Sequence, residues 1–272
     1  MPSDNNAPQT PAAPEPDETL NNMQSLSQVL FTPARSIDEL KQAFALVYRT
    51  YLDRGYIAPT ENQLRFGIHN LLPEATTFVA VLRETVIATA TLIADSPLGL
   101  PMDQVYRDEL NKLRRQDRRI AEVTMLADRR RQFRRTLPML LALFRTTMDY
   151  AIDVLALDDL CITLNPRHEQ FYRRFLCFED LGPLKSYASV RDNPALAKRF
   201  SLRDLPALLA RDKRYKALHA RTDGINQAPH SDRLALTAED VSALIPLLPD
   251  PTDVTPSARQ HLAQLYGPDI LL

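Results

Sequence analysis

The central part of this 272-residue chain is predicted to have an α/β fold. Its sheet is expected to be mixed, of the α+β type. Helical and strand patterns alternate along it, which is typical of helices layered on a sheet. The strongest helical pattern, residues 136–155, lies between strand patterns at residues 120–126 and 160–164. A long helix between two strands usually returns the chain in the same direction. We therefore expect these two strands to be parallel and joined by a right-handed crossover.

The periodicity of apolar residues gives the order of the elements. Ser36 is expected to cap the first helix, with Glu39 in the position of a capping box. A hairpin is expected where only Arg83-Glu84-Thr85 separates two strand patterns. The helices are predicted at residues 36–55, 61–71, 102–113, 136–155 and 166–176, and the strands at residues 77–82, 86–94, 120–126, 160–164 and 187–191.

Composition divides the chain into three parts. Residues 1–28 are poor in apolar side chains and hold five of the 21 prolines within the first 16 positions, so we expect a disordered tail. Residues 29–192 carry the alternating pattern and are expected to form the folded domain. Residues 193–272 are expected to form a helical and proline-rich C-terminal extension, with residues 193–220 as a polar helical segment.

The overall composition favours a cytoplasmic protein. The formal net charge of −1 argues against the whole chain as an electrostatic partner for nucleic acid. Cys161 and Cys177 fall in predicted core positions, which favours a reduced protein, and no Cys, His and Asp spacing indicates a metal site. No apolar run is long enough to span a membrane, and the N-terminus lacks the pattern of a signal peptide.

Three segments carry a family resemblance. They are Val47-Tyr48-Arg49-Thr50-Tyr51-Leu52-Asp53-Arg54-Gly55-Tyr56, Ala121-Glu122-Val123-Thr124-Met125-Leu126, and Asn165-Pro166-Arg167-His168 followed by Phe171-Tyr172 and Cys177-Phe178. Their order and spacing resemble the GNAT superfamily of acyltransferases and, within it, the FeeM-type N-acyl amino acid synthases, which are similar to acyl-homoserine-lactone synthases. The resemblance covers residues 36–192 and implies a GNAT-like acyltransferase fold. It also implies that a fatty acyl group comes from the phosphopantetheine of acyl carrier protein, with no tightly bound cofactor.

One loop departs from the pattern of the superfamily. In most members a glycine-rich backbone after the central strand wraps a pyrophosphate, whereas residues 131–136 here read Arg-Gln-Phe-Arg-Arg-Thr. Arginine and threonine replace the glycines, so we expect side chains to bind a phosphate in place of a backbone cradle. This favours the single phosphate diester of a carrier protein over the pyrophosphate of coenzyme A.

Residues 112–135 are strongly basic, with ten basic side chains against three acidic ones. A solvated surface and nonspecific nucleic-acid binding are both consistent with such a cluster, but no recognition motif accompanies it. We prefer a docking site for the acidic carrier protein, because the cluster ends at a predicted helix N-terminus, which favours an anion. The expected carrier- and phosphopantetheine-binding residues are Arg129, Arg130, Arg131, Arg134, Arg135, Thr136 and Asn165.

The candidate catalytic residues are Glu122 and Tyr172. Glu122 lies in an apolar strand, where burial should raise its pKa and prepare it to take a proton from an attacking amine. A structural carboxylate paired with Arg or Tyr is the alternative. The resemblance implies that Tyr172 is the general acid for the departing thiolate, with core packing as the alternative. It also implies that the backbone N–H of Met125 or Leu126 stabilises the oxyanion, which is typically worth about 3 kcal/mol.

The remaining candidates bind the substrates. Asn165 is equally suited to position pantetheine and to cap the helix that begins at Pro166. His168 is expected at the surface and is assigned no role. An amino-acid acceptor needs a cation for its carboxylate, and the resemblance places the N-terminal helix and the following loop over the site. The acceptor candidates are Arg49, Arg54, Tyr56 and Arg65, with Tyr51 as a further wall.

These residues together predict an N-acyltransferase. It would move a medium- or long-chain fatty acyl group from acyl carrier protein to the α-amino group of an amino acid by direct attack on the thioester. The alternatives are an acyl-homoserine-lactone-type signal synthase, which would use S-adenosylmethionine, and a catalytically inactive GNAT-fold module that binds acyl groups or carrier protein. The expected partners are acyl carrier protein and the acceptor, without nucleic acid, and the lipid product could give loose membrane association.

Overall fold

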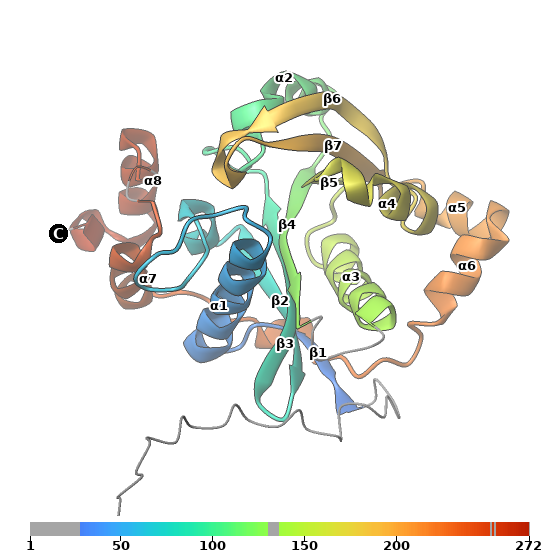
Figure 1. Ribbon diagram of the computed structural model, residues 1–272, viewed down its shortest axis with the longest axis horizontal. Coiled ribbons are helices and arrows are strands. Elements are labelled where there is room, and N and C mark those ends of the chain that lie inside the picture. The colour runs from blue at the N-terminus through green and yellow to red at the C-terminus, as the bar shows by residue number, and fades with distance from the viewer. Residues whose placement is uncertain (1–27, 130–135, 251, 253, 272) are drawn as a thin grey trace, which may run out of the picture.

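A computed structural model describes residues 28–129, 136–250, 252 and 254–271 (Figure 1). Its centre is a seven-stranded sheet in the order β1-β2-β3-β4-β5-β7-β6. Neighbouring strands are antiparallel except for β4 and β5, which are parallel. The strands are β1 (Leu30–Pro33), β2 (Ala75–Leu82), β3 (Thr85–Ala94), β4 (Ile120–Asp128), β5 (Asp159–Leu164), β6 (Glu179–Tyr187) and β7 (Asn193–Ser201).

Helices cover both faces of the sheet. The α-helices are α1 (Ile37–Asp53), α2 (Asp103–Arg114), α3 (Thr136–Asp153), α4 (Glu169–Phe175), α5 (Leu205–Arg211), α6 (Lys213–Ala220), α7 (Ala238–Leu244) and α8 (Pro256–Tyr266). Shorter 3-10 helices include η3 (Ile68–Leu71), η4 (Pro166–His168), η5 (Ala188–Val190), η6 (His230–Asp232), η7 (Ile245–Leu247) and η9 (Pro268–Leu271). Figure 1 shows α3 on one side of the central strands and α1, with α7 and α8 beyond it, on the other. Among the described residues, three apolar cores follow from this arrangement, one under α3, one under α1 and a smaller one under α2.

Most of the predicted elements are confirmed. Ser36 caps α1, and its hydroxyl accepts from the Glu39 N–H at 3.1 Å. The Glu39 carboxylate, however, accepts from the Arg35 N–H, one residue before the position that a capping box requires. The hairpin between β2 and β3 turns through Arg83 and Glu84, whose φ angles of 48° and 64° match the twist of a two-residue turn. The expected parallel crossover through α3 is also present.

Three expectations about the fold are corrected, and strand β1 was missed. Residues 61–71 do not form a helix throughout, because only η3 is helical there. β1 was not predicted, because four residues are too few for a period. The strand expected at 187–191 is wrong, since β6 ends at Tyr187 and η5 follows. The helical extension expected from 193 is also wrong at its start, because β7 lies inside the sheet between β5 and β6, so the folded domain continues past residue 192.

β7 was not recognised as a strand because its sequence is polar. Lys198 is 1% exposed and would be costly to bury alone. Its ammonium is paired with Glu169, at 2.7 Å, and with Asp180. These ion pairs satisfy the charge, and the strand therefore occupies an interior position despite its polarity.

The feature of the sheet that positions the functional site is the short contact between β4 and β5. They pair only from Ile120 to Glu122, opposite residues 159–161. Beyond these three pairs β4 continues along β3 and β5 continues along β7, so the two strands separate. At the separation β4 carries a bulge, where Met125 has a φ of 54° and the register with β3 shifts. A bulge bends a strand and leaves the extra residue without its ladder partner.

A buried ion pair fixes the paired end of these two strands. Asp159, the first residue of β5, is fully buried. Its carboxylate accepts from the Arg118 Nη2 at 2.8 Å and lies 3.3 Å from the Arg199 Nε. Arg118 stands two residues before β4, so the pair connects the starts of both parallel strands.

The Arg118→Ala variant should lose about 3 kcal/mol of unfolding free energy, because it removes the closer partner of a buried carboxylate. Urea denaturation followed by circular dichroism measures this loss. The control is Arg115→Ala, since Arg115 is exposed on the neighbouring turn and should change stability by less than about 0.5 kcal/mol. Equal midpoints for the two variants would contradict the role given to Arg118.

Candidate functional site

A cavity of about 1600 Å³ opens where β4 and β5 separate. Typical small-molecule pockets measure about 300–1,000 Å³, so this one has room for a long or a two-part ligand. Its walls differ in chemistry along its length. The apolar arm, between β4, β5, α3 and α4, is lined by Leu126, Leu140, Phe144, Ile162, Leu164, Phe171 and Leu176. The polar arm, on the side of α1 and η5, is lined by Tyr51, Arg54, Tyr56, Arg65, Tyr187 and Ser189.

The bulge of β4 lies at the junction of the two arms. Thr124, Met125 and Leu126 all line the cavity. Met125 and Leu126 lie beyond the residues that pair with β5, and the register shift leaves them between the pairs that Thr124 and Ala127 form with β3. The bulge that the expected oxyanion donor requires is therefore present, and it lies against the cavity. The role of either backbone N–H stays a prediction.

Glu122 is buried below the cavity, and its side chain does not line it. The carboxylate accepts a hydrogen bond from the Met102 N–H, at 2.8 Å. Burial raises the pKa of Glu122 to about 8, although the Met102 hydrogen bond acts against this shift. The charge of Glu122 in turn contributes to the raised pKa of Tyr51 and Tyr187, both of which burial raises first. These two tyrosines line the polar arm, so the charge of Glu122 acts on groups in the cavity wall.

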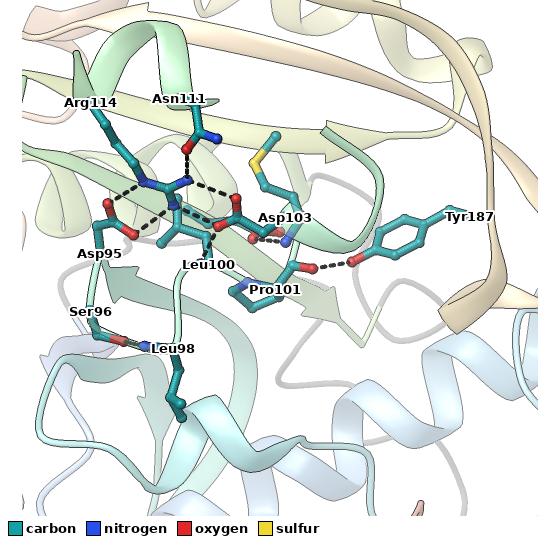
Figure 2. Close-up of polar contacts among 11 residues, drawn as sticks. Asp95, Ser96, Leu98, Leu100, Pro101, Asp103, Asn111, Arg114 and Tyr187 are labelled. Carbon is teal, nitrogen blue, oxygen red and sulfur yellow. Dashed lines mark hydrogen bonds and ion pairs between the residues drawn. The ribbon is translucent and has the colours of Figure 1, made fainter. Parts of the chain in front are cut away.

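A polar network holds the segment that contacts Glu122 (Figure 2). The Arg114 guanidinium donates to Asp95 at 2.7 and 2.8 Å and to Asp103 at 2.8 and 2.6 Å. Asp103 also accepts from the Leu100 N–H at 2.7 Å, and the Tyr187 hydroxyl donates to the Pro101 carbonyl at 3.2 Å. Figure 2 shows these contacts converging on the turn before α2. The network therefore fixes the turn that carries the Met102 N–H.

The structure gives part of the basic segment 112–135 a structural role, and docking of a carrier protein on this segment stays a prediction. Arg114 and Arg118 are both neutralised by buried or half-buried carboxylates. Arg129 is half-buried, and its Nε donates to the Val86 carbonyl at 3.1 Å. Burial, with a smaller effect of Arg49, lowers the pKa of Arg129. Arg114 and Arg118 therefore stabilise the fold, and the carrier-binding role expected for Arg129 stays a prediction.

The other predicted carrier-binding residues are only partly described. Arg130, Arg131, Arg134 and Arg135 lie outside the described residues, and Thr136 is the first residue of α3. Asn165 lines the cavity, and its Oδ1 accepts from the Arg167 N–H at 3.2 Å. The capping role expected for Asn165 is therefore confirmed, and its position in the cavity wall keeps a substrate contact open.

Tyr172 also lines the cavity, in the apolar arm. Its ring packs edge-on against Phe171 and Phe178, with centroid distances of 5.4 and 5.7 Å. Tyr172 therefore packs against the core and also lies at the site. His168, expected at the surface, is half-buried and lines the cavity as well.

The structure separates the acceptor candidates. Arg54, Tyr56 and Arg65 line the polar arm, whereas Arg49 is exposed on α1 and does not line the cavity. The Arg65 Nη2 donates to the Ser189 carbonyl at 3.0 Å, which fixes its guanidinium at the wall. The Tyr56 hydroxyl accepts from the Arg167 Nη2 at 2.6 Å, which connects the loop after α1 to η4.

Sequence reasoning missed a wall of this cavity. Residues from the C-terminal extension line the polar arm about 185 positions after Arg65, and their sequence gave no signal beyond its proline and aspartate content. Tyr187 and His69 were also missed, since each looks like an ordinary core residue in the sequence. Among the described residues, no cluster of three or more His, Cys, Asp or Glu side chains could hold a metal ion. Within the same residues, no helix has both the length and the apolar character to cross a membrane.

Comparison with known proteins gives a consistent set of similarities. The family model of N-acyl amino acid synthase FeeM matches residues 42–201. The structure of FeeM, an N-acyl amino acid synthase from uncultured soil microbes, is 31% identical, with 67% of this chain and 95% of that chain covered at a TM-score of 0.59. None of the curated proteins matches this sequence.

Two more distant structures share the fold. BjaI, a coenzyme A-dependent acyl-homoserine lactone synthase solved with MTA, is 14% identical and covers 75% of this chain and 96% of its own, at a TM-score of 0.54. TofI, solved in a ternary complex with an inhibitor and MTA, is 12% identical and covers 71% and 96%, at a TM-score of 0.52. The predicted GNAT-like α/β fold is confirmed.

Glu122 should make the native state less stable as the pH rises. Burial raises its pKa to about 8, whereas a glutamate in an unfolded chain titrates near about 4.3. Between these values the native state keeps a proton that the unfolded state has lost. The stabilisation is therefore full below the unfolded pKa and is lost as pH rises through the folded pKa, by up to about 1.4 kcal/mol per pH unit.

Urea unfolding at several pH values between about 5 and 9 measures this effect. The control is Glu122→Gln, which keeps an acceptor for the Met102 N–H but cannot titrate. Relative to this variant, the wild-type unfolding free energy should fall across the range. Parallel profiles for the two proteins would mean that Glu122 titrates as an ordinary glutamate.

Proposed function

The chain belongs to the FeeM family of N-acyl amino acid synthases and is an acyltransferase, and from this premise we propose that it transfers a medium- or long-chain fatty acyl group from acyl carrier protein to the α-amino group of an amino acid. The observation that carries the proposal is the meeting of an apolar arm and a cationic polar arm at the bulge of β4. A fatty acyl chain needs the first environment, and an amino-acid carboxylate needs the second. The thioester carbonyl would lie where the two arms meet.

The apolar arm supports a long acyl chain as the donor group. Leu140, Phe144 and Phe171 give it aliphatic and aromatic walls from two helices. Each buried CH₂ contributes about 0.8 kcal/mol to binding, so an acyl chain that fills the arm gains far more than an acetyl group. Acyl carrier protein as the source of that chain rests on the sequence of residues 131–136, where arginines replace the glycines of a pyrophosphate cradle.

The polar arm supports an amino-acid acceptor, and Arg65 is the cation that we assign to its carboxylate. A guanidinium binds a carboxylate with two parallel hydrogen bonds when it is held in place. Arg65 is held by the Ser189 carbonyl, and its charge acts on Tyr51 and Tyr187 in the same arm. Arg54 is a further cation of the arm. The exposed position of Arg49 leaves it out of this role.

The reaction is a direct transfer. The amine nitrogen attacks the thioester carbonyl carbon, and the N–H of Met125 or Leu126 stabilises the oxyanion. The carbon–sulfur bond then breaks, and the sulfur leaves with the electron pair. In the fraction of the protein in which Glu122 is ionised, its carboxylate takes the amine proton through water or a tyrosine hydroxyl, because its side chain does not line the cavity. Tyr172 gives a proton to the thiolate, although a thiolate with a pKa near about 8.5 needs little help to leave.

Acyl transfer should be detected by mass spectrometry after incubation with carrier protein loaded with a long acyl chain and a mixture of amino acids. N-acyl amino acids are the expected products. Acyl-coenzyme A at equal concentration tests the donor, and S-adenosylmethionine tests a signal-synthase acceptor. Acetyl-coenzyme A activity without long-chain products would contradict the donor assignment, whereas a lactone product would contradict the acceptor. Binding of acyl carrier protein without any turnover would indicate an inactive module.

The Arg65→Gln variant should raise the KM for the amino acid by about 10- to 100-fold, since a lost charged hydrogen bond costs roughly 1.5–3 kcal/mol. The KM for the acyl donor should not change. Arg49→Gln is the matched control, because it removes an arginine of the same region that does not line the cavity. Steady-state kinetics with each substrate varied separately would measure both. A larger effect of Arg49→Gln would move the carboxylate site out of the polar arm.

A further inference from the structure

The C-terminal extension contributes a wall to the polar arm. We define the C-terminal wall as its cavity-lining residues Pro249, Asp250, Thr252, Thr255, Ser257 and Ala258. The match to the FeeM family model ends at residue 201. This wall therefore comes from a part of the chain that the family match does not include, and it faces the same space as Arg65.

The extension that carries this wall is packed into the fold. Leu244, Leu248 and Leu262 are buried in the same core as Phe44 of α1. The Tyr266 hydroxyl donates to the Leu71 carbonyl at 2.8 Å. Figure 1 shows α7 and α8 beside α1 and the loop that follows it. The wall is thus held in place by buried contacts on the side of α1.

A hydrogen bond also ties the extension to the loop before Arg65. The Asn62 Nδ2 donates to the Leu247 carbonyl, two residues before the wall begins. A direct contact therefore joins the segment before the wall to the loop before Arg65.

The wall presents mainly polar groups. The Asp250 carboxylate accepts from the Thr252 N–H at 2.9 Å and from the Thr252 hydroxyl at 2.6 Å. These hydrogen bonds, with a smaller effect of Arg65, lower the pKa of Asp250. Asp250 forms no ion pair with any described residue, whereas Asp103, the other acid that lines the cavity, is paired with Arg114. Ser257 adds an exposed hydroxyl on the first turn of α8.

We propose that the C-terminal wall contacts the side chain of the acceptor amino acid and selects side chains that form hydrogen bonds over apolar ones of the same shape. The inference rests on the proposed function, since it assumes that the polar arm holds an amino acid. With the acceptor carboxylate on Arg65 and its amine directed to the bulge of β4, the side chain extends toward the remaining wall of the arm. Thr252 already holds Oδ1 of the exposed Asp250 carboxylate, and an apolar side chain there would displace solvent from the rest of this carboxylate without replacing its hydrogen bonds, which is unfavourable.

The first test varies the size of the wall. Ser257→Trp places a large ring into the polar arm and should raise the KM for the acceptor about tenfold or more, with the KM for the acyl donor unchanged. Gln260→Trp is the matched control, because Gln260 is exposed on the same helix and does not line the cavity. Melting temperatures of both variants show whether each is folded.

The second test varies the chemistry of the wall. Wild-type kcat/KM is measured for the near-isosteric pairs threonine and valine, asparagine and leucine, and glutamine and methionine. The polar member should be preferred about fivefold or more, and Asp250→Ala should reduce that preference by a similar factor.

Two results would overturn the inference while the proposed function stands. One is a Ser257→Trp variant that forms N-acyl amino acids with an unchanged acceptor KM. The other is a wild-type preference for the apolar member of every pair. Failure of the wild-type protein to acylate any amino acid would instead contradict the proposed function, and the inference would fall with it.

Discussion

The short parallel contact between β4 and β5 is the constraint on which the rest of the structure depends. Three residue pairs join these strands, and the buried Asp159 with Arg118 and Arg199 fixes the paired end. β4 and β5 separate beyond Glu122, and this separation creates the cavity. The bulge at Met125 bends β4 along the cavity. A sheet that stayed paired along its whole length would have no space for a substrate between its central strands. The candidate functional site thus lies where the hydrogen bonding between β4 and β5 stops.

The charged groups at this site are of two kinds: those that line the cavity and those that are buried behind its wall. Glu122 is buried beside the turn before α2, and its raised pKa follows from that burial. Arg114 and Arg118, which precede Glu122 in the sequence, are used for structure, since Arg114 holds the turn that Glu122 contacts and Arg118 pairs with Asp159. Arg54 and Arg65, which line the polar arm, come instead from the end of α1 and the loop that follows it. The basic residues in the sequence therefore indicated a binding site. Their burial and ion pairs in the structure decide which of them can contact a ligand there.

Much of the fold could be predicted from the sequence because its signals are local. The stripe of α3, the tight turn at Arg83 and Glu84 and the crossover between β4 and β5 each depend on residues close in the chain. β7 could not be predicted, because the burial of Lys198 depends on Glu169 and Asp180 in other elements. The C-terminal wall could not be predicted for the same reason, since only tertiary packing brings it opposite Arg65. Family resemblance supplied the order of the site residues, while their exposure and partners came from the structure.

The most direct test of the account is a crystal structure with a non-hydrolysable acyl-pantetheine analogue, in which the thioester is replaced by a thioether ketone. The account predicts the acyl chain in the apolar arm and the carbonyl oxygen within about 3 Å of the N–H of Met125 or Leu126. It also predicts that the pantetheine passes between the separated ends of β4 and β5. An analogue bound with its carbonyl away from the bulge, or with its acyl chain in the polar arm, would contradict the account.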